Sequence, residues 1–237
     1  MTTLLALDLG NTSAKYAVFF EGRKKDAGRL SGDGDFTSLP EADRVVAVSV
    51  NPATLARVRE VVSGLEVVGE ELPLPLPVLY HPPEDCGADR VLGVAGAFHL
   101  LPEARAVLVL DAGTCLTATF GERDRGVVGG AILPGPDLMA WALAEGTQTL
   151  PRVEPAPVEK VIGRSTETSI RSGIQAAVRG AIRELVQRCR EESALDFDVV
   201  AAGTGGTALA AALPEIGAVH PDATLWGVYA AAYEPAD

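Results

Sequence analysis

Short apolar runs that end in a small polar turn occur twice along the chain. Residues 4–7 and 106–110 are built from Leu, Val and Ala, and such unbroken runs predict buried strands. A second run, rich in β-branched and aromatic residues, follows each of them at 15–20 and at 116–120. Each pair of runs therefore predicts a hairpin, and the repetition suggests two related halves.

The remaining patterns predict further strands and helices. Strands are expected within 3–35, with breaks at Gly22 and in the cluster 31–35, and at 45–50, 126–132 and 199–202. Alternating Leu and Pro at 72–77 predict an extended connector. Helices are expected at about 54–63, with Thr54 as N-cap, and at 87–101, 137–146, 166–190, 207–212 and 226–233.

Strands followed by helices, twice over, predict an α/β protein with two halves of βββαβα type. The expected division is 1–103 and 104–237, with the first polar turn in one half and the second in the other. Each half would contribute one hairpin to a shared site.

Composition and charge restrict the possible partners. The 237 residues include 47% hydrophobic and 22% charged residues, as is typical of a well-packed soluble protein. A net charge of −12 disfavours nucleic acid or an anionic membrane as a partner, because both require a basic surface. The 3 cysteines lack metal-ligand spacing, and no apolar run is long enough to cross a membrane, so a cytoplasmic location is expected.

The two hairpin turns share a motif, DLGNT at 8–12 and DAGT at 111–114. Glycine lets a backbone approach a phosphate, backbone N–H groups and a Thr hydroxyl donate to it, and the Asp can hold a cation or its water shell. One copy alone is equally an ordinary turn, but two copies after buried strands favour a phosphate site. The candidate nucleotide-binding residues are Asp8, Gly10, Asn11, Thr12, Lys15, Gly113 and Thr114.

A second candidate site is the segment GADR at 87–90, at the start of a predicted helix. A helix N-terminus offers free N–H groups to an anion, and the Arg90 guanidinium is suited to a carboxylate or a phosphate. Asp89 can act as a base, can simply stabilise the helix dipole, or can form a surface ion pair with Arg90.

The turn GTGG at 203–206 lies between a predicted strand and helix. Gly205 and Gly206 would let a ribose or a flat ring lie against the backbone, although the turn can also be a plain strand-to-helix connection. Neither the dinucleotide fingerprint nor the P-loop motif is present, which disfavours those two classes of nucleotide-binding protein. The glycine-rich segments 129–135 and 146–152 suit packing or subunit contacts.

The duplicated motif resembles the acetate and sugar kinase, heat-shock 70 and actin superfamily, whose two ribonuclease-H-like halves hold ATP in the cleft between them. A longer series of motifs resembles the type III pantothenate kinases. In order, the series is DLGNTSAK at 8–15, SVNP at 49–52, Tyr80, GADR at 87–90, DAGT at 111–114, GGAILPG at 129–135, LPRVE at 150–154, IGRST at 162–166, SG at 172–173 and TGG at 204–206. The set in this order covers nearly the whole chain and is specific.

The resemblance implies an ATP-dependent kinase that phosphorylates the primary hydroxyl of pantothenate to 4'-phosphopantothenate, the first step of coenzyme A biosynthesis. It implies a homodimer whose substrate pocket includes residues of the partner. In such an enzyme the first turn binds the ATP phosphates, Thr114 contacts ATP, and Asp8 holds Mg²⁺ directly or through water. Asp111 would ligate a monovalent cation, K⁺ or NH₄⁺.

The resemblance also assigns the acceptor side of the reaction. Asp89 would be the base that acts on the pantothenate hydroxyl. The residues that would line the pantothenate site are Tyr80, Gly87, Ala88, Asp89, Arg90 and Thr166.

Two other functions stay open on the same scaffold. One is a non-catalytic regulatory protein of the transcription accessory type, which is disfavoured by the intact Asp8, Lys15, Asp89, Arg90 and Asp111. The other is a small-molecule kinase for a sugar or a carboxylate, which the short chain and the segment from Tyr80 to GADR disfavour.

Overall fold

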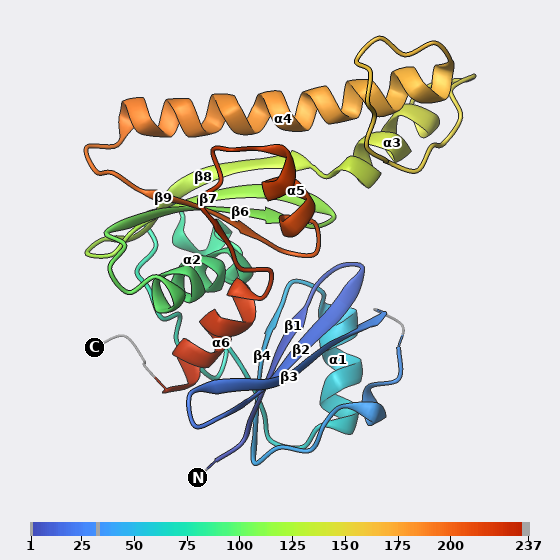
Figure 1. Ribbon diagram of the computed structural model, residues 1–237. Coiled ribbons are helices and arrows are strands. Elements are labelled where there is room, and N and C mark those ends of the chain that lie inside the picture. The colour runs from blue at the N-terminus through green and yellow to red at the C-terminus, as the bar shows by residue number, and fades with distance from the viewer. Residues whose placement is uncertain (1, 32–33, 234–237) are drawn as a thin grey trace.

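The protein contains two five-stranded mixed sheets with the same topology. The computed structural model describes residues 2–31 and 34–233, so Gly32 and Asp33 of the predicted break lie outside the described residues. The strand orders are β3-β2-β1-β4-β5 and β10-β9-β6-β7-β8. Read from the opposite edge, the second order repeats the first, which confirms the two related halves that the hairpin motifs predict (Figure 1).

The first sheet forms around β1 (Leu4–Leu9), whose apolar side chains are buried on both faces. β1 pairs antiparallel with β2 (Ser13–Phe20) and parallel with β4 (Arg44–Ser49). β3 (Arg23–Ser31) and β5 (Leu65–Val67) complete the edges. A central strand covered on both faces must be apolar along its whole length, which explains the unbroken run in the sequence.

The second sheet forms in the same way around β6 (Ala106–Ala112). This strand pairs antiparallel with β7 (Cys115–Glu122) and parallel with β9 (Asp198–Ala202). The edge strands are β8 (Gly126–Pro134) and β10 (Ala218–Val219). The predicted strands of this half are therefore confirmed.

The helices that face the interior are α2 (Ala88–Leu100) and α6 (Ala223–Tyr233), and they cross between the sheets (Figure 1). Buried side chains of α2 pack against residues of β6 and β9 in the second sheet, although α2 precedes that half in the chain. The core of α6 packs with β1, β2 and β4 of the first half. Each half thus supplies a helix that packs against the sheet of the other half.

Two glycines allow these helices to approach closely. A Cβ added at Gly96 would lie 1.8 Å from the carbonyl oxygen of Ala223, and one at Gly227 would lie 2.0 Å from that of Leu92. Both distances are far below van der Waals contact, so no side chain larger than hydrogen fits at the crossing.

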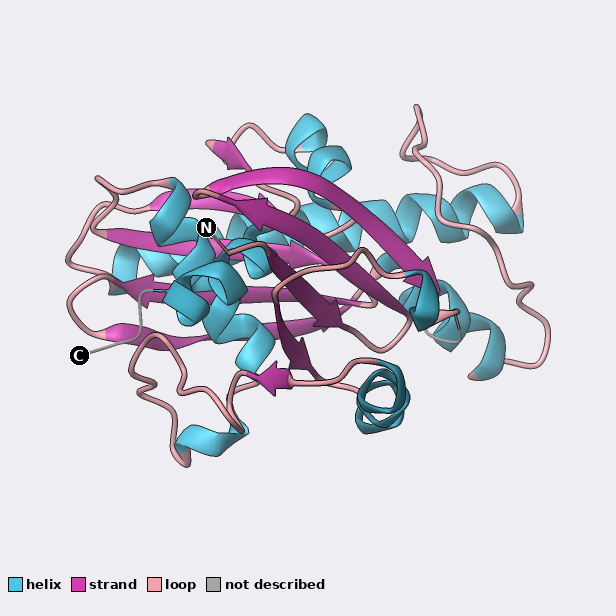
Figure 2. Ribbon diagram, turned by 90° about the horizontal axis from the view of Figure 1, so that it is seen from below, coloured by secondary structure: helices cyan, strands magenta, loops and turns pink. Residues whose placement is uncertain are grey.

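The outer surfaces carry the other helices. α4 (Thr166–Glu192) packs its apolar face against the side of the second sheet opposite α2, and α5 (Gly206–Ala212) joins that cluster. The N-terminal part of α4 projects beyond the sheet together with α3 (Pro136–Glu145) and the segment 146–165 (Figures 1 and 2). We call these three parts the arm.

No helix in the described ranges is both long and apolar enough to span a bilayer.

The first outer helix, α1 (Pro52–Val61), begins two residues earlier than predicted. Asn51 is the N-cap, because its side chain accepts a hydrogen bond of 3.1 Å from the N–H of Thr54. The prediction of Thr54 as N-cap was wrong because Pro52 already has the fixed φ that suits a first helical residue. The three-residue β5 and two-residue β10 were not predicted, because so few residues leave no periodicity to detect.

The helix crossing gives a stability prediction. Gly227→Ala should lower the free energy of unfolding by about 3 kcal/mol or more, since the new methyl group would force backbone apart at the crossing. Gly180→Ala on exposed α4 is the matched control, because nothing lies within 4 Å of its added Cβ, and it should stabilise by up to about 1 kcal/mol. Denaturant unfolding checks both variants, and equal stability of the two would contradict the proposed close packing.

Candidate active site

The turns of the two duplicated hairpins meet between the sheets. In each turn the glycine N–H donates to a backbone carbonyl, from Gly10 to Ser13 at 3.1 Å and from Gly113 to Cys115 at 3.0 Å. The hydroxyls of Thr12 and Thr114 are hydrogen-bonded to one another at 2.7 Å. Two threonines that are 102 positions apart in sequence are therefore in direct contact at the tips, and both are exposed.

Asp8 lies near the end of β1, where its carboxylate is largely removed from water. Its side chain is 14% exposed, and burial raises its pKa from 3.8 to about 6. The ammonium of Lys15, 3.6 Å away across the β1–β2 pair, opposes this shift, whereas the charges of Asp111 and Asp89 add to it. One lysine thus compensates only part of the negative charge.

Asp111 occupies the matching position on β6. Burial raises its pKa, Lys15 lowers it, and Asp89 raises it again. Gly203 lies directly against this carboxylate, because an added Cβ would be 2.2 Å from Oδ1, and its φ of +76° also favours glycine. The N–H of Gly205 donates to the carbonyl of Ala112 at 2.9 Å, so the turn 203–206 packs on the DAGT turn.

Gly203 belongs to the turn 203–206 that the sequence analysis named, but the sequence analysis gave it no role in the site. The motif TGG drew attention to its own glycines, Gly205 and Gly206. A glycine directly after a strand carries no distinguishing signal in the sequence. Only the register of β6 beside β9, with Asp111 opposite Ala202, places it against the carboxylate.

Asp89 lies in the first turn of α2, after the N-cap Gly87. Its Oδ1 accepts a hydrogen bond of 2.9 Å from the N–H of Arg90, and burial raises its pKa against the opposing effects of that N–H, of the Arg90 charge and of Lys15. The mutual electrostatic influence of Asp8, Asp89, Asp111 and Lys15 indicates that three carboxylates and one ammonium lie near one another, and we call this group the cleft residues.

Arg90 points away from the cleft residues toward the second sheet. It is 8% exposed, its Nε donates to the hydroxyl of Thr119 at 3.1 Å, and its guanidinium carbon lies 5.3 Å from the ring centre of Tyr80. The alternative of a surface ion pair between Asp89 and Arg90 is therefore wrong, because consecutive helical residues point in different directions and Arg90 is buried.

Thr166 is the one predicted site residue that lies apart from the others. It is exposed at the first position of α4, on the arm. α4 covers the face of β6 that carries Leu108 and Leu110, whereas α2 covers the opposite face with Val107 and Val109. Within one chain, the helix that begins at Thr166 and the helix that carries Asp89 therefore cover opposite faces of the sheet.

The charge balance of the cleft residues suits cations. Three partly buried carboxylates facing one ammonium favour a bound cation, and oxygen ligands are those that Mg²⁺ and K⁺ prefer. Among the described residues, no group of three or more His, Cys, Asp or Glu side chains forms a ready-made metal cage. A cation here would therefore complete its coordination with water or phosphate oxygens, as Mg²⁺ commonly does.

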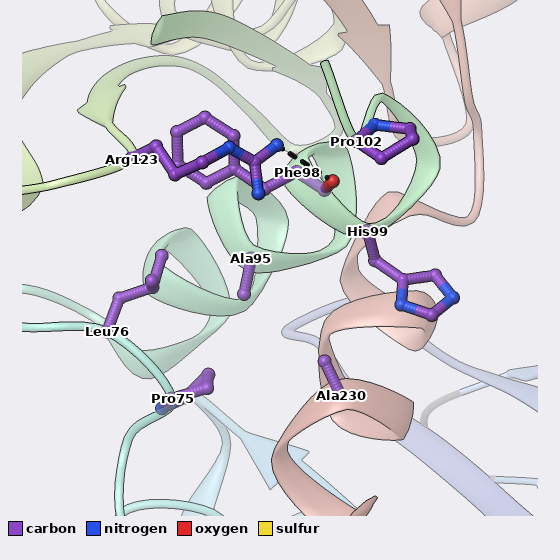
Figure 3. Close-up of a pocket in the computed structure, with 8 residues that line it drawn as sticks. All are labelled: Pro75, Leu76, Ala95, Phe98, His99, Pro102, Arg123 and Ala230. Atoms are coloured by element: carbon purple, nitrogen blue, oxygen red, sulfur yellow. Dashed lines mark hydrogen bonds between the residues drawn. The ribbon is translucent and has the colours of Figure 1, made fainter. Parts of the chain in front are cut away.

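A separate hollow of about 300 Å³ lies at the other end of α2 (Figure 3). Its lining is mainly apolar, and its one permanent cation, Arg123, donates to the carbonyls of Phe98 at 3.2 Å and Leu101 at 2.9 Å. These are the last carbonyls of the helix, which need such donors. Arg123 therefore has a structural role, and the hollow contains no arrangement of groups suited to the chemistry of the cleft residues.

Comparison with known proteins identifies relatives along most of the chain. Residues 4–188 match the family model for type III pantothenate kinase. A type III pantothenate kinase of Dehalococcoides mccartyi is 32% identical over 95% of this chain and 95% of its own length. One of Chlorobium luteolum is 35% identical over 87% of this chain and 84% of its own length.

Solved structures confirm the fold class. A protein of Campylobacter jejuni assigned to the Baf family of transcriptional activators aligns with a TM-score of 0.63 at 14% identity, over 97% of this chain and 98% of that one. Component A of (R)-2-hydroxyglutaryl-CoA dehydratase from Acidaminococcus fermentans aligns with a TM-score of 0.54 at 15% identity, over 98% and 96%. These neighbours share the actin-like ATPase fold of two ribonuclease-H-like halves, as predicted.

The raised pKa of Asp8 gives a pH-dependent prediction. Because the folded protein binds this proton more tightly than the unfolded chain, the contribution to stability is complete below about pH 4 and is lost as the pH rises through about 6. Without nucleotide or metal, Asp8→Asn should raise the free energy of unfolding at pH 8 by about 1–3 kcal/mol, with less gain at pH 5. Thermal and denaturant unfolding at both pH values measure this.

The matched control is Asp124→Asn, which neutralises an exposed aspartate in the β7–β8 turn. It should change stability little at either pH. A destabilised Asp8→Asn at pH 8 would mean that the Lys15 ion pair outweighs the desolvation of the carboxylate.

Proposed function

The chain belongs to the type III pantothenate kinase family and phosphorylates pantothenate with ATP, and we propose here how its residues perform that reaction. The observation that carries the proposal is the contact of the two hairpin turns through Thr12 and Thr114, beside the mutually interacting Asp8, Lys15, Asp89 and Asp111. Transfer of a phosphoryl group requires mainly positioning and charge neutralisation, and these residues combine both.

The two hairpin turns bind the triphosphate. Their glycines leave the backbone accessible, and the exposed hydroxyls of Thr12 and Thr114 turn from one another to the phosphate oxygens. Asn11 completes the first turn, and Lys15 extends its ammonium over the same tip. Gly205 and Gly206, packed behind the DAGT turn, form the surface for the ribose or the base.

Cations neutralise the remaining charge. Asp8 holds Mg²⁺ directly or through water, and Asp111, backed by Gly203, holds a monovalent cation, K⁺ or NH₄⁺. Bound there, the ions offset the charge of the transferring phosphate. The affinity for the Mg²⁺ ion at Asp8 should fall as the pH decreases toward 6, because protons compete for the Asp8 carboxylate.

Asp89 is the general base. It lies at a helix start within the electrostatic influence of Lys15, and its raised pKa makes it a better proton acceptor than an exposed aspartate. As the primary hydroxyl of pantothenate attacks the γ-phosphorus in line, its proton passes to Asp89, the bond from the γ-phosphorus to the β–γ bridging oxygen breaks, and ADP leaves.

The pantothenate site surrounds the start of α2. Gly87 and Ala88 present backbone there, while Arg90 with Tyr80 supplies a buried cation for the substrate carboxylate. Asp89 and Arg90 point in different directions from one helical turn, which suits a substrate with a hydroxyl at one end and a carboxylate at the other.

The exposed arm suits a homodimer. Large apolar side chains are exposed there, with Val161 at 77%, Ile162 at 83% and Trp141 at 44%. Such residues favour an interface with another protein surface. A second subunit would also bring a Thr166 from outside to the pantothenate site, which Thr166 of the same chain does not reach.

The alternatives have less support. A regulatory protein would have no need for the buried carboxylates and Lys15, whose burial costs stability. A kinase for another acceptor is disfavoured because the chain matches two relatives named type III pantothenate kinase over most of their length. We further propose that the protein acts in the cytoplasm without binding nucleic acid or membrane, which its net charge of −12 supports.

The assignment of the base can be tested directly. Asp89→Asn should bind ATP normally but lose at least about 100-fold in kcat, because the amide cannot accept the hydroxyl proton. Steady-state phosphorylation of pantothenate and nucleotide binding by calorimetry measure the two properties. The exposed Asp85→Asn is the control, and full activity of Asp89→Asn would remove Asp89 from this role.

The dimer can be tested through the arm. Ile162→Asp should shift the protein to a monomer and abolish most activity, because a charge would be buried in the interface. Light scattering coupled to gel filtration gives the mass of each form. The control is Val219→Asp, whose side chain is 40% exposed on β10, outside the arm, and a wild-type monomer at micromolar concentration would contradict the proposal.

A further inference from the structure

Arg90 is held in one position by three neighbours from different elements. Its Nε donates to Thr119 on β7, the Tyr80 ring covers its guanidinium, and Gly130 on β8 lies beside its Nη2. A Cβ added at Gly130 would be 2.7 Å from Nη2. Thr119 and Gly130 are direct partners in the β7–β8 register, so one point of the sheet forms the support for the guanidinium.

Arg90 forms no ion pair with a carboxylate in the described part of the chain, although its positive charge lowers the pKa of the neighbouring Asp89. The buried Nη2 atom of Arg90 has no hydrogen-bond partner among the described residues. A buried cation in this state favours an anionic ligand strongly, since that ligand becomes its ion-pair partner.

Thr119 is suited to orient this cation without neutralising it. The residue is 2% exposed, and its hydroxyl accepts one hydrogen bond from Nε. A neutral acceptor fixes the direction of a long, flexible side chain and leaves its positive charge available. The edge of the guanidinium that carries Nε and Nη2 lies against the sheet, so the remaining nitrogen, Nη1, is turned away from it.

We propose that Thr119 is a positioning residue that sets the specificity of the site for a carboxylate-bearing acceptor. It acts through Arg90 and touches no reacting atom. This inference rests on the proposed binding of the pantothenate carboxylate by Arg90.

Thr119→Val tests the inference, since it removes the hydroxyl and retains the shape. We expect the KM for pantothenate to rise about tenfold or more, as for loss of one hydrogen bond to a charged group, with kcat and the KM for ATP within about twofold. Thr119→Ser should restore the KM. For the analogue in which a primary carboxamide replaces the carboxylate, Thr119→Val and the wild type should have the same KM.

Controls separate this role from a structural one. Thr224→Val on α6 alters a threonine that is 5% exposed and forms no hydrogen bond with Arg90 among the described residues, so the KM of this variant for pantothenate should equal that of the wild type. If Thr119→Val does not fold, Thr119→Ala removes the same hydroxyl without adding a methyl group. An unchanged KM for pantothenate, or an equal rise for the carboxamide, would overturn the inference.

The proposed function fails in a different way. A wild-type enzyme that does not discriminate between pantothenate and its carboxamide would contradict the role of Arg90 and, with it, that of Thr119. A wild-type enzyme that discriminates, together with a Thr119→Val enzyme that discriminates equally well, would contradict the role of Thr119 alone.

Discussion

The close crossing of α2 and α6 determines how the two halves of the molecule face one another. Each helix packs on the sheet of the other half, and the crossing leaves no room for a side chain at Gly96 or Gly227. The sheets are therefore held at a distance that backbone atoms set. That distance brings the two hairpin turns into contact through Thr12 and Thr114, and it brings the start of α2 close to these turns.

The cleft residues work against the stability of the fold. Three carboxylates with one lysine lose hydration without full compensation, and their raised pKa values measure that cost. A protein selected for stability alone would place apolar residues or a second lysine there. Uncompensated carboxylates favour the binding of cations, so under the proposed function the cost to folding is recovered as affinity for the cations that accompany ATP.

The sequence predicts the parts of the structure that repeat and fails at contacts between distant segments. Unbroken apolar runs identify the central strands, and the duplicated turns predict the shared site before any coordinates. The sequence could not place Gly203 against Asp111, because that contact depends on the pairing of β9 with β6. Nor could it show Arg90 turned toward Thr119, since Thr119 lies 29 residues further along the chain, on β7.

The duplication explains the nucleotide side of the site, whereas the acceptor side depends on where the halves differ. Each inner helix has an aspartate at its start. Asp89 is the second residue of α2, and Asp222 immediately precedes α6. Asp222 forms an ion pair with Lys24 and is neutralised on the surface of the first sheet. Asp89 has no such partner within the described residues and faces Lys15 and two further carboxylates instead. A symmetric pair of helices thus supplies one structural aspartate and one that remains able to accept a proton. The proposed reaction therefore depends on the loss of symmetry at the start of α2.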